Sequence, residues 1–268
     1  MKSSERYYGW IPDLADQRDV LHTTPGEVLQ ALPEAVDVRS LCPPVYDQGK
    51  LGSCTANAIA AAIAFEQRKL DAPERFTPSR LFIYYNERAL QGTTTADTGA
   101  PLREGMKAVN HVGVCPEDQP EDTANWPYDP AQFASKPPDS CYAAARHVRA
   151  LRYSRVRHAA EALKGCLAEG YPFVFGITVY ESFESPQVKR TGMVMLPEKH
   201  ERVIGGHAIM AVGYDDARQV LIVRNSWGPG WGDQGYGYLP YDYLFARGLA
   251  RDFWTIRLIS DQVKDTSK

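Results

Sequence analysis

The stretch Gln48-Gly49-Lys50-Leu51-Gly52-Ser53-Cys54-Thr55-Ala56 decides the fold, because it leads directly into an alanine-rich helical pattern. It places one cysteine at the N-terminus of the predicted helix, with a side-chain amide, Gln48, six residues upstream. Two further motifs lie far downstream, Gly205-Gly206-His207-Ala208 and Arg224-Asn225-Ser226-Trp227-Gly228. A thiol, an imidazole and an amide in this chain order are the parts of a cysteine nucleophile system.

The surroundings predicted for Cys54 favour its thiolate form. An ordinary thiol has a pKa of about 8.5 and is mostly protonated near neutral pH. The N-terminus of a helix directs unpaired N–H groups and the positive end of the helix dipole toward the sulfur, which lowers the thiol pKa. An imidazolium at His207 would lower it further, and Asn225 would hold the other ring nitrogen in one tautomer. Trp227 would shield that hydrogen bond from water.

Gln48 suits a different role. Its carboxamide N–H is a neutral donor that can point, with the backbone N–H of Cys54, at a developing oxyanion. Each residue also has an ordinary structural interpretation: a small buried cysteine, a core histidine, an asparagine that opens a turn and a loop glutamine. The functional interpretation is wrong only if all four ordinary ones hold together, so the combined pattern favours a nucleophile site.

Composition limits the classes of partner. The 268 residues suit one large domain or two packed lobes, and the net charge of −3 gives no electrostatic reason to expect nucleic acid. Residues 1–10 lack the apolar core of a signal peptide, and no apolar run is long enough to span a membrane. The default expectation is a cytoplasmic protein, with signal-independent export left open. Apart from Cys54, the four cysteines Cys42, Cys115, Cys141 and Cys166 could pair, but free thiols are favoured in these surroundings.

Periodicity separates the chain into a helical part and a strand-rich part. Residues 1–31 read as a leader, followed by a body over residues 32–268. We expect helices over 55–70, from a cap at Thr77, after Gly99, and near 159–168 with Gly170 at its end. Residues 113–141 read as loop, and the predicted strands are 171–179, 207–214, 219–224, 235–239 and 252–258. This order predicts an α+β fold with a helical lobe at about 45–145 and a strand lobe at about 146–268.

Four segments carry a resemblance to a known family. They are Leu32-Pro33-Glu34-Ala35-Val36-Asp37-Val38-Arg39, the stretch from Gln48 to Cys54, Gly206-His207-Ala208 through Tyr214, and Asn225-Ser226-Trp227-Gly228-Pro229-Gly230-Trp231-Gly232 followed by Gly235-Tyr236. In this order they resemble the papain-like cysteine peptidases, over residues 32 to about 260. The resemblance implies a two-lobe fold, with a helical left lobe, a β-barrel right lobe and the active site in the cleft between them.

The resemblance also assigns roles. It makes Cys54 the nucleophile, His207 the general base and acid, Asn225 the residue that orients His207, and Gln48 the oxyanion donor. The substrate-binding positions that it suggests are Gly52, Gly99, Ala100, Gly206, Trp227 and Trp231. For Gly99 an equally open alternative is that it merely ends a loop before a helix. No metal or organic cofactor is implied.

Two departures and the leader set this chain apart from the secreted members of the family. Leu51 and Thr55 stand where the family usually has a disulfide cysteine and a tryptophan, and the cysteine-asparagine-glycine-glycine segment is absent. Residues 1–31 are too short for the long helical propeptide of the eukaryotic enzymes, so the chain resembles bacterial members. We hypothesise that this leader covers the cleft as a short propeptide and restrains activity. The alternative is an accessory segment on the back surface.

The sequence therefore predicts a cysteine endopeptidase that hydrolyses peptide bonds through an acyl-thioester. Its expected partners are peptide or protein substrates, with no nucleic acid and no membrane, and we expect a monomer. Two rivals stay open: an acyl transferase that passes the acyl group to an amine, and a silent binding module that keeps the cleft to hold peptides.

Overall fold

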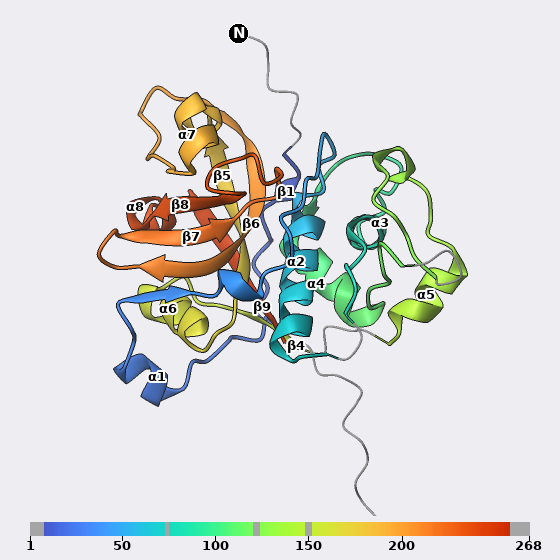
Figure 1. Ribbon diagram of the computed structural model, residues 1–268. Helices are drawn as coiled ribbons and strands as arrows, with labels where there is room; N and C mark the ends of the chain where they lie inside the picture. Colours follow the sequence, from blue (N-terminus) through green and yellow to red (C-terminus); the bar gives the residue numbers. More distant parts are fainter. Residues whose placement is uncertain (1–7, 73–74, 120–123, 148–151, 258–268) are drawn as a thin grey trace, which may run out of the picture.

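The structure is a computed structural model that describes residues 8–72, 75–119, 124–147 and 152–257. The helices α3 (Arg80–Ala89), α4 (Leu102–His111) and α5 (Asp139–Ala145) lie on one side of the long helix α2 (Cys54–Lys69), and an antiparallel sheet with the remaining helices lies on the other (Figure 1). The first seven residues of the predicted leader and residue 258 of the last predicted strand lie outside the described residues.

The predicted helices form close to their expected positions. The helices of the described residues are α1 (Gly26–Gln30), α2, α3 (Arg80–Ala89), α4 (Leu102–His111), α5 (Asp139–Ala145), α6 (Ala160–Ala168), α7 (Pro186–Thr191) and α8 (Tyr241–Phe245), with 3₁₀ turns at Arg39–Leu41, Pro130–Gln132 and Glu181–Glu184. The cap predicted at Thr77 is wrong. Ser79 caps α3 instead and accepts a hydrogen bond from the Phe82 N–H at 3.1 Å.

The strands form one large antiparallel sheet and one small parallel pair. They are β1 (Trp10–Ile11), β2 (Ala35–Asp37), β3 (Ala100–Pro101), β4 (Arg152–Arg155), β5 (Phe173–Tyr180), β6 (Val203–Asp215), β7 (Val220–Arg224), β8 (Tyr236–Pro240) and β9 (Ala250–Arg257). The large sheet has the order β4-β9-β5-β6-β7-β8, and β2 pairs with the far end of β6.

The large sheet does not close into the expected β-barrel within the described residues, because other segments occupy its two edges. At the β8 edge, the Val194 N–H donates to the Tyr238 carbonyl at 3.0 Å. At the β4 edge, the Arg155 N–H donates to the carbonyl of Val20, a leader residue, at 2.8 Å. The two-lobe arrangement forms nevertheless, with an open sheet in place of the barrel.

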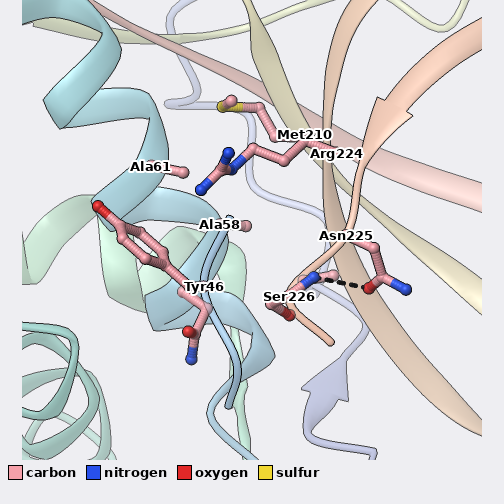
Figure 2. Close-up of a pocket in the computed structure, with 9 residues that line it drawn as sticks. Tyr46, Ala58, Ala61, Met210, Arg224, Asn225 and Ser226 are labelled. Atoms are coloured by element: carbon pink, nitrogen blue, oxygen red, sulfur yellow. Dashed lines mark hydrogen bonds between the residues drawn. The ribbon is translucent and has the colours of Figure 1, made fainter. Parts of the chain in front are cut away.

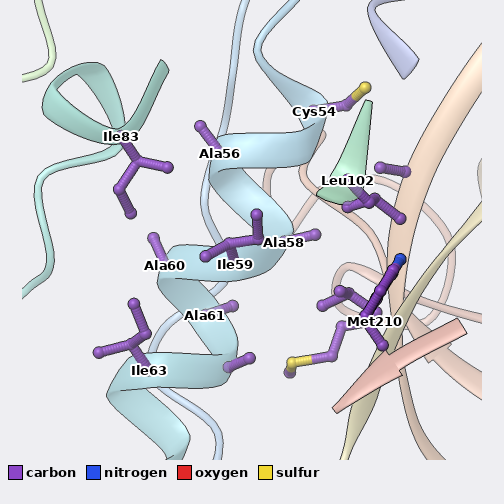
Figure 3. Close-up of a cluster of buried hydrophobic side chains, with 14 of the residues drawn as sticks. Cys54, Ala56, Ala58, Ile59, Ala60, Ala61, Ile63, Ile83, Leu102 and Met210 are labelled. Atoms are coloured by element: carbon purple, nitrogen blue, oxygen red, sulfur yellow. The ribbon is translucent and has the colours of Figure 1, made fainter. Parts of the chain in front are cut away.

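The helix α2 is buried because its small side chains let both lobes approach it. Fourteen of its 16 residues are buried, from Cys54 to Gln67, as expected for a helix that is apolar nearly all round. Ile83 of α3 packs on one side of it and Met210 of β6 on the other (Figure 3). This packing fixes the N-terminal end of α2, where Cys54 lies, between the helical lobe and the sheet.

The described part of the leader runs between the lobes and contacts both. Its strand β1 pairs in parallel with β3, so Trp10 lies opposite Ala100 (Figure 1). Further along, the Trp254 indole of β9 donates to the Asp13 carboxylate at 2.8 Å, and Arg103 of α4 forms an ion pair with Asp19 at 2.6 Å. Trp10 is only 5% exposed and belongs to the same buried cluster as Ala208. The leader is therefore an integral part of the packing between the two lobes.

Candidate active site

Cys54 begins α2 and faces the strand that carries His207. Both residues are fully buried. The backbone groups of Ala208, the residue after His207, and of Gly9 and Thr55 lie close enough to the Cys54 thiol to lower its pKa. The N-terminus of α2 and the strand residue next to the histidine therefore lie against the same sulfur atom. The structure places the predicted thiol beside the strand that carries the predicted imidazole.

The ring of His207 is held in one orientation by Asn225. The His207 Nε2 and the Asn225 Oδ1 lie 2.7 Å apart. The same Oδ1 accepts the backbone N–H of Ser226 at 2.8 Å, which identifies this atom of the carboxamide as the oxygen. The hydrogen of the His207–Asn225 bond is therefore on Nε2. In the neutral ring the lone pair then resides on Nδ1, the nitrogen that can accept a proton from a thiol.

Gln48 is fixed on both ends of its carboxamide. Its Nε2 donates to the Leu51 carbonyl at 3.0 Å, and its Oε1 accepts from the Ser226 hydroxyl at 2.6 Å. The Tyr128 hydroxyl donates to the main-chain carbonyl of Gln48 at 3.0 Å. Because one amide hydrogen is used by Leu51, only the second hydrogen of the same NH₂ group is left for another acceptor. Ser226 connects Gln48 to the segment of Asn225.

Aromatic rings enclose the histidine. Trp227 lies 4.9 Å from the His207 ring centroid at an interplanar angle of 32°, and Trp231 packs edge-on against Trp227 at 5.6 Å. Phe183 stacks on Trp231 at 5.8 Å and meets Trp227 edge-on at 5.5 Å. The two tryptophans predicted from the sequence therefore adjoin the site. Phe183 was not predicted, since it follows β5 in a segment with no motif of its own.

Behind the site, a small cavity lies between α2 and the sheet, lined by Tyr46, Asn57, Ala58, Ala61, Ala208, Met210, Arg224, Asn225 and Ser226. Figure 2 shows Arg224 and Tyr46 reaching into the space between the two lobes, next to the hydrogen bond from Ser226 to Asn225. Arg224 donates to the Pro43 and Pro44 carbonyls at 2.7 and 2.5 Å. These bonds attach the segment before Gln48 to the strand that ends beside Asn225.

The leader passes directly over the predicted site. The ring of Tyr8 meets both His207 and Trp227 edge-on, each at 6.1 Å. The backbone of Gly9 lies against the Cys54 thiol, and the Gly9 carbonyl accepts the Ala100 N–H at 2.8 Å. The leader therefore contacts both Cys54 and His207, which are fully buried in the structure.

The remaining predicted positions all contact this segment. A Cβ atom added at Gly52 would lie 3.5 Å from the Gly9 Cα, and one at Gly99 would lie 1.9 Å from the Gly9 carbonyl oxygen. A Cβ at Gly206 would lie 2.5 Å from the Trp10 carbonyl oxygen. The glycines therefore let a backbone approach closely. Gly99, with φ of 70°, also ends the loop before β3 and α4, so both interpretations of this residue stay open.

Burial reverses the expected effect on the thiol. Desolvation raises the pKa of Cys54 to about 11 and outweighs the backbone hydrogen bonds, which lower it. The expectation of a lowered pKa assumed an accessible sulfur, whereas here the leader excludes water. All five cysteines are free thiols, as expected. Among the described residues no group of three His, Cys, Asp or Glu side chains is placed to hold a metal ion.

The papain family cysteine protease model matches residues 32–243. The chain belongs to the papain family of cysteine proteases. It is 44% identical to xylellain, a cysteine protease from Xylella fastidiosa, whose crystal structure matches with a TM-score of 0.85 over 97% of this chain and 98% of that one. The peptidase C1-like protein L477 of Acanthamoeba polyphaga mimivirus is 40% identical, over 96% of this chain and 89% of that protein.

More distant relatives agree with this assignment. Cysteine proteinase 3 of Entamoeba histolytica is 28% identical over 84% of this chain and 68% of that protein. The procathepsin B S9 structure from Trypanosoma congolense, at 17% identity, shares the fold with a TM-score of 0.72 over 96% of this chain and 87% of that one. The fold is papain-like, and the protein is a cysteine-type peptidase, a hydrolase of peptide or protein substrates. In the described part of the chain, every helix is too short or too polar to span a membrane.

Proposed function

We propose that the protein is an endopeptidase that uses Cys54 as nucleophile, and that the leader, residues 1–31, restrains it as a short propeptide. In this proposal residues 32–268 form the peptidase domain, with a helical lobe at about 45–145 and a sheet lobe at about 146–268. One observation carries the first part: the thiol at the start of α2 lies against the backbone of Ala208, which follows a histidine whose Nε2 is held by Asn225.

The reaction follows from the tautomer of His207. Nδ1 of the ring takes the proton of the Cys54 thiol as the sulfur attacks the substrate carbonyl carbon. The oxyanion that forms is stabilised by the second Nε2 hydrogen of Gln48 and by the backbone N–H of Cys54. The imidazolium then gives its proton to the departing amine, which leaves an acyl-thioester.

Deacylation reverses these proton transfers. His207 takes a proton from water as the water oxygen attacks the thioester carbonyl carbon, and a second oxyanion forms in the same place. When this intermediate collapses, the C–S bond breaks and the sulfur leaves with the proton held by His207. The products are an amine and a carboxylic acid, and the thiol is regenerated.

The restraint follows from the path of the leader. Tyr8, Gly9 and Trp10 occupy the positions next to His207, Cys54 and Gly206 where a substrate would have to lie. Peptide binding at Cys54 therefore requires that the leader moves. The ion pair between Arg103 and Asp19, together with the bond from Trp254 to Asp13, anchors the segment that follows.

The test compares the full-length protein with a chain that starts at residue 32, each with and without Cys54→Ala. We expect hydrolysis of an internally quenched peptide and alkylation by iodoacetamide at pH 6 in the shortened chain, lower rates in the full-length chain, and neither reaction with Cys54→Ala. Equal rates in the two chains would contradict the restraint. Alkylation without hydrolysis would favour the silent binding module, and product joined to an added amine would favour the transferase.

A further inference from the structure

Two glycines, Gly52 and Gly99, form the two walls of a channel that confines the leader backbone beside the nucleophile. A Cβ atom at Gly9 would lie 1.6 Å from the Gly52 carbonyl oxygen, and a Cβ at Gly99 would lie 1.9 Å from the Gly9 carbonyl oxygen. One wall, Gly52, belongs to the loop that leads into Cys54, and the other, Gly99, to the loop before β3. The space between them is as wide as a bare peptide main chain and admits no side chain pointing at either wall.

A single carboxylate bridges the two walls. The backbone N–H of Gly52 lies 3.1 and 3.0 Å from the two carboxylate oxygens of Asp97, which stands two residues before Gly99. Asp97 also accepts a hydrogen bond from the Tyr84 hydroxyl, which in turn accepts the Gly99 N–H at 3.1 Å. Asp97 and Tyr84 therefore connect both walls to each other and to α3.

The partners of Asp97 are arranged to act as donors. Tyr84 is fully buried in α3, and burial together with the neighbouring Asp97 raises the pKa of its phenol, so it keeps the hydroxyl hydrogen. The Gly52 N–H is a permanent donor. Since all five cysteines are free thiols, no disulfide holds the walls together. Their separation depends on hydrogen bonds to one charged group, which are stronger than those between neutral groups.

We propose that Asp97 is a positioning residue of the peptidase: it holds Gly52 and Gly99 at the separation that accepts an extended peptide main chain beside Cys54. The proposal rests on the proposed function of the cleft. The ligand that this channel recognises is a peptide backbone in extended form, the chemistry that the leader presents at Gly9. Asp97 does not touch the reacting atoms and acts through the two walls.

The experiment compares two alkylating reagents on full-length protein that carries Gly9→Ala, because the added methyl group cannot coexist with the docked leader. Iodoacetamide has no main chain to bind, whereas an alanine tripeptide chloromethyl ketone must lie between the walls to reach Cys54. The variants are Asp97→Ala, Asp97→Asn and Tyr84→Phe. Asp129→Asn is the control, because its carboxylate also accepts a backbone N–H, from Ala131 at 3.0 Å, but on the exposed 3₁₀ turn Pro130–Gln132.

We expect Asp97→Ala to lower the rate with the peptide reagent on the order of 10- to 100-fold, the size expected for lost hydrogen bonds to a charged group. The iodoacetamide rate should stay within about twofold, as expected for a group that acts on the channel alone. Asp97→Asn keeps one carbonyl acceptor and Tyr84→Phe removes one donor, so each should lower the rate with the peptide reagent by a smaller factor. Asp129→Asn should leave that rate unchanged.

Equal changes in both rates would overturn the proposal, and so would no change in either rate. A parent protein that reacts no faster with the peptide reagent than with iodoacetamide would also overturn it. The thermal unfolding midpoint of each variant shows whether a loss reflects folding, in which case Asp97→Asn and Tyr84→Phe decide the question. Hydrolysis of a quenched peptide is measured in parallel. Its absence from a parent that discriminates the reagents would refute the endopeptidase function and leave the role of Asp97 intact.

Discussion

Adding one methyl group to the leader, by Gly9→Ala, should expose the nucleophile of the full-length protein. The new Cβ would lie 1.6 Å from the Gly52 carbonyl oxygen and 2.4 Å from the Gly52 carbonyl carbon. Carbon and oxygen atoms in contact are normally about 3.3 Å apart or more, so one of the two segments has to move by more than about 1.5 Å. Gly52 lies two residues before the buried start of α2, which fixes its position, and the leader is therefore the segment that moves away.

The thiol pKa gives the size of the effect. Burial under the leader raises the pKa of Cys54 to about 11, and an exposed thiol has a pKa of about 8.5. At pH 7 the thiolate fraction then rises from about 10⁻⁴ to about 3 × 10⁻², roughly 300-fold. The helix N-terminus and His207 increase it further once water is admitted. We expect the second-order rate of iodoacetamide alkylation at pH 7 to rise by about 100-fold or more.

Gly26→Ala is the matched control, because Gly26 is a leader glycine at which an added Cβ meets nothing within 4 Å. Iodoacetamide should alkylate this variant at the same rate as the unmodified protein. Mass spectrometry of the labelled peptide shows whether Cys54 is the residue that reacts. A Gly9→Ala rate within about threefold of the unmodified protein would refute the reasoning, and so would an equal increase in Gly26→Ala.

Three further predictions test the leader and the site. Gly176→Val should also release the leader, because a Cβ at this position would lie 1.9 Å from the Trp10 ring. The rate of alkylation by iodoacetamide should rise as in Gly9→Ala. An unchanged rate would count against the docking of Trp10 on β5. Burial is the largest cause that raises the pKa of Asp13 to about 6, and the negative charge of Asp252 is the second, while hydrogen bonds from Arg103 and Trp254 lower it. The pKa of an exposed aspartate is about 3.9. Docking is therefore fully favoured below about pH 4 and weakens by about 100-fold as the pH rises to about 6. The alkylation rate of the unmodified protein relative to Asp13→Asn should fall by about 30-fold from pH 6 to pH 4, and a flat ratio would contradict it. Asn225→Ala in Gly9→Ala protein should lower kcat on a quenched peptide by about 100-fold with KM nearly unchanged, because an unheld imidazole loses its orientation; an unaffected kcat would remove Asn225 from the mechanism.

Long elements with regular apolar spacing could be predicted from the sequence alone. The alanine-rich pattern at 55–70 forms α2, the predicted strand 207–214 falls within β6, and the predicted strand 219–224 matches β7 to within one residue. The two-residue strands β1 and β3 could not be predicted, because their pairing exists only where the leader meets the loop before α4. The cap of α3 was misplaced for a similar reason. Thr77 donates its hydroxyl to Asp118 at 2.8 Å, a contact 41 residues away that leaves Ser79 as the cap.

The site shows the same division between local chemistry and long-range contact. Cys54, His207, Asn225 and Gln48 could be named because each sits in a motif whose neighbours are informative. The role of Asp97 could not be predicted, since nothing local indicates that its carboxylate reaches the Gly52 N–H 45 residues away. The protonation state of the thiol was misjudged because it depends on a third segment, the leader, that the motif does not contain. The motifs therefore contain the candidate reactive groups, whereas the contacts that the leader and Asp97 make with them come from segments outside the motifs.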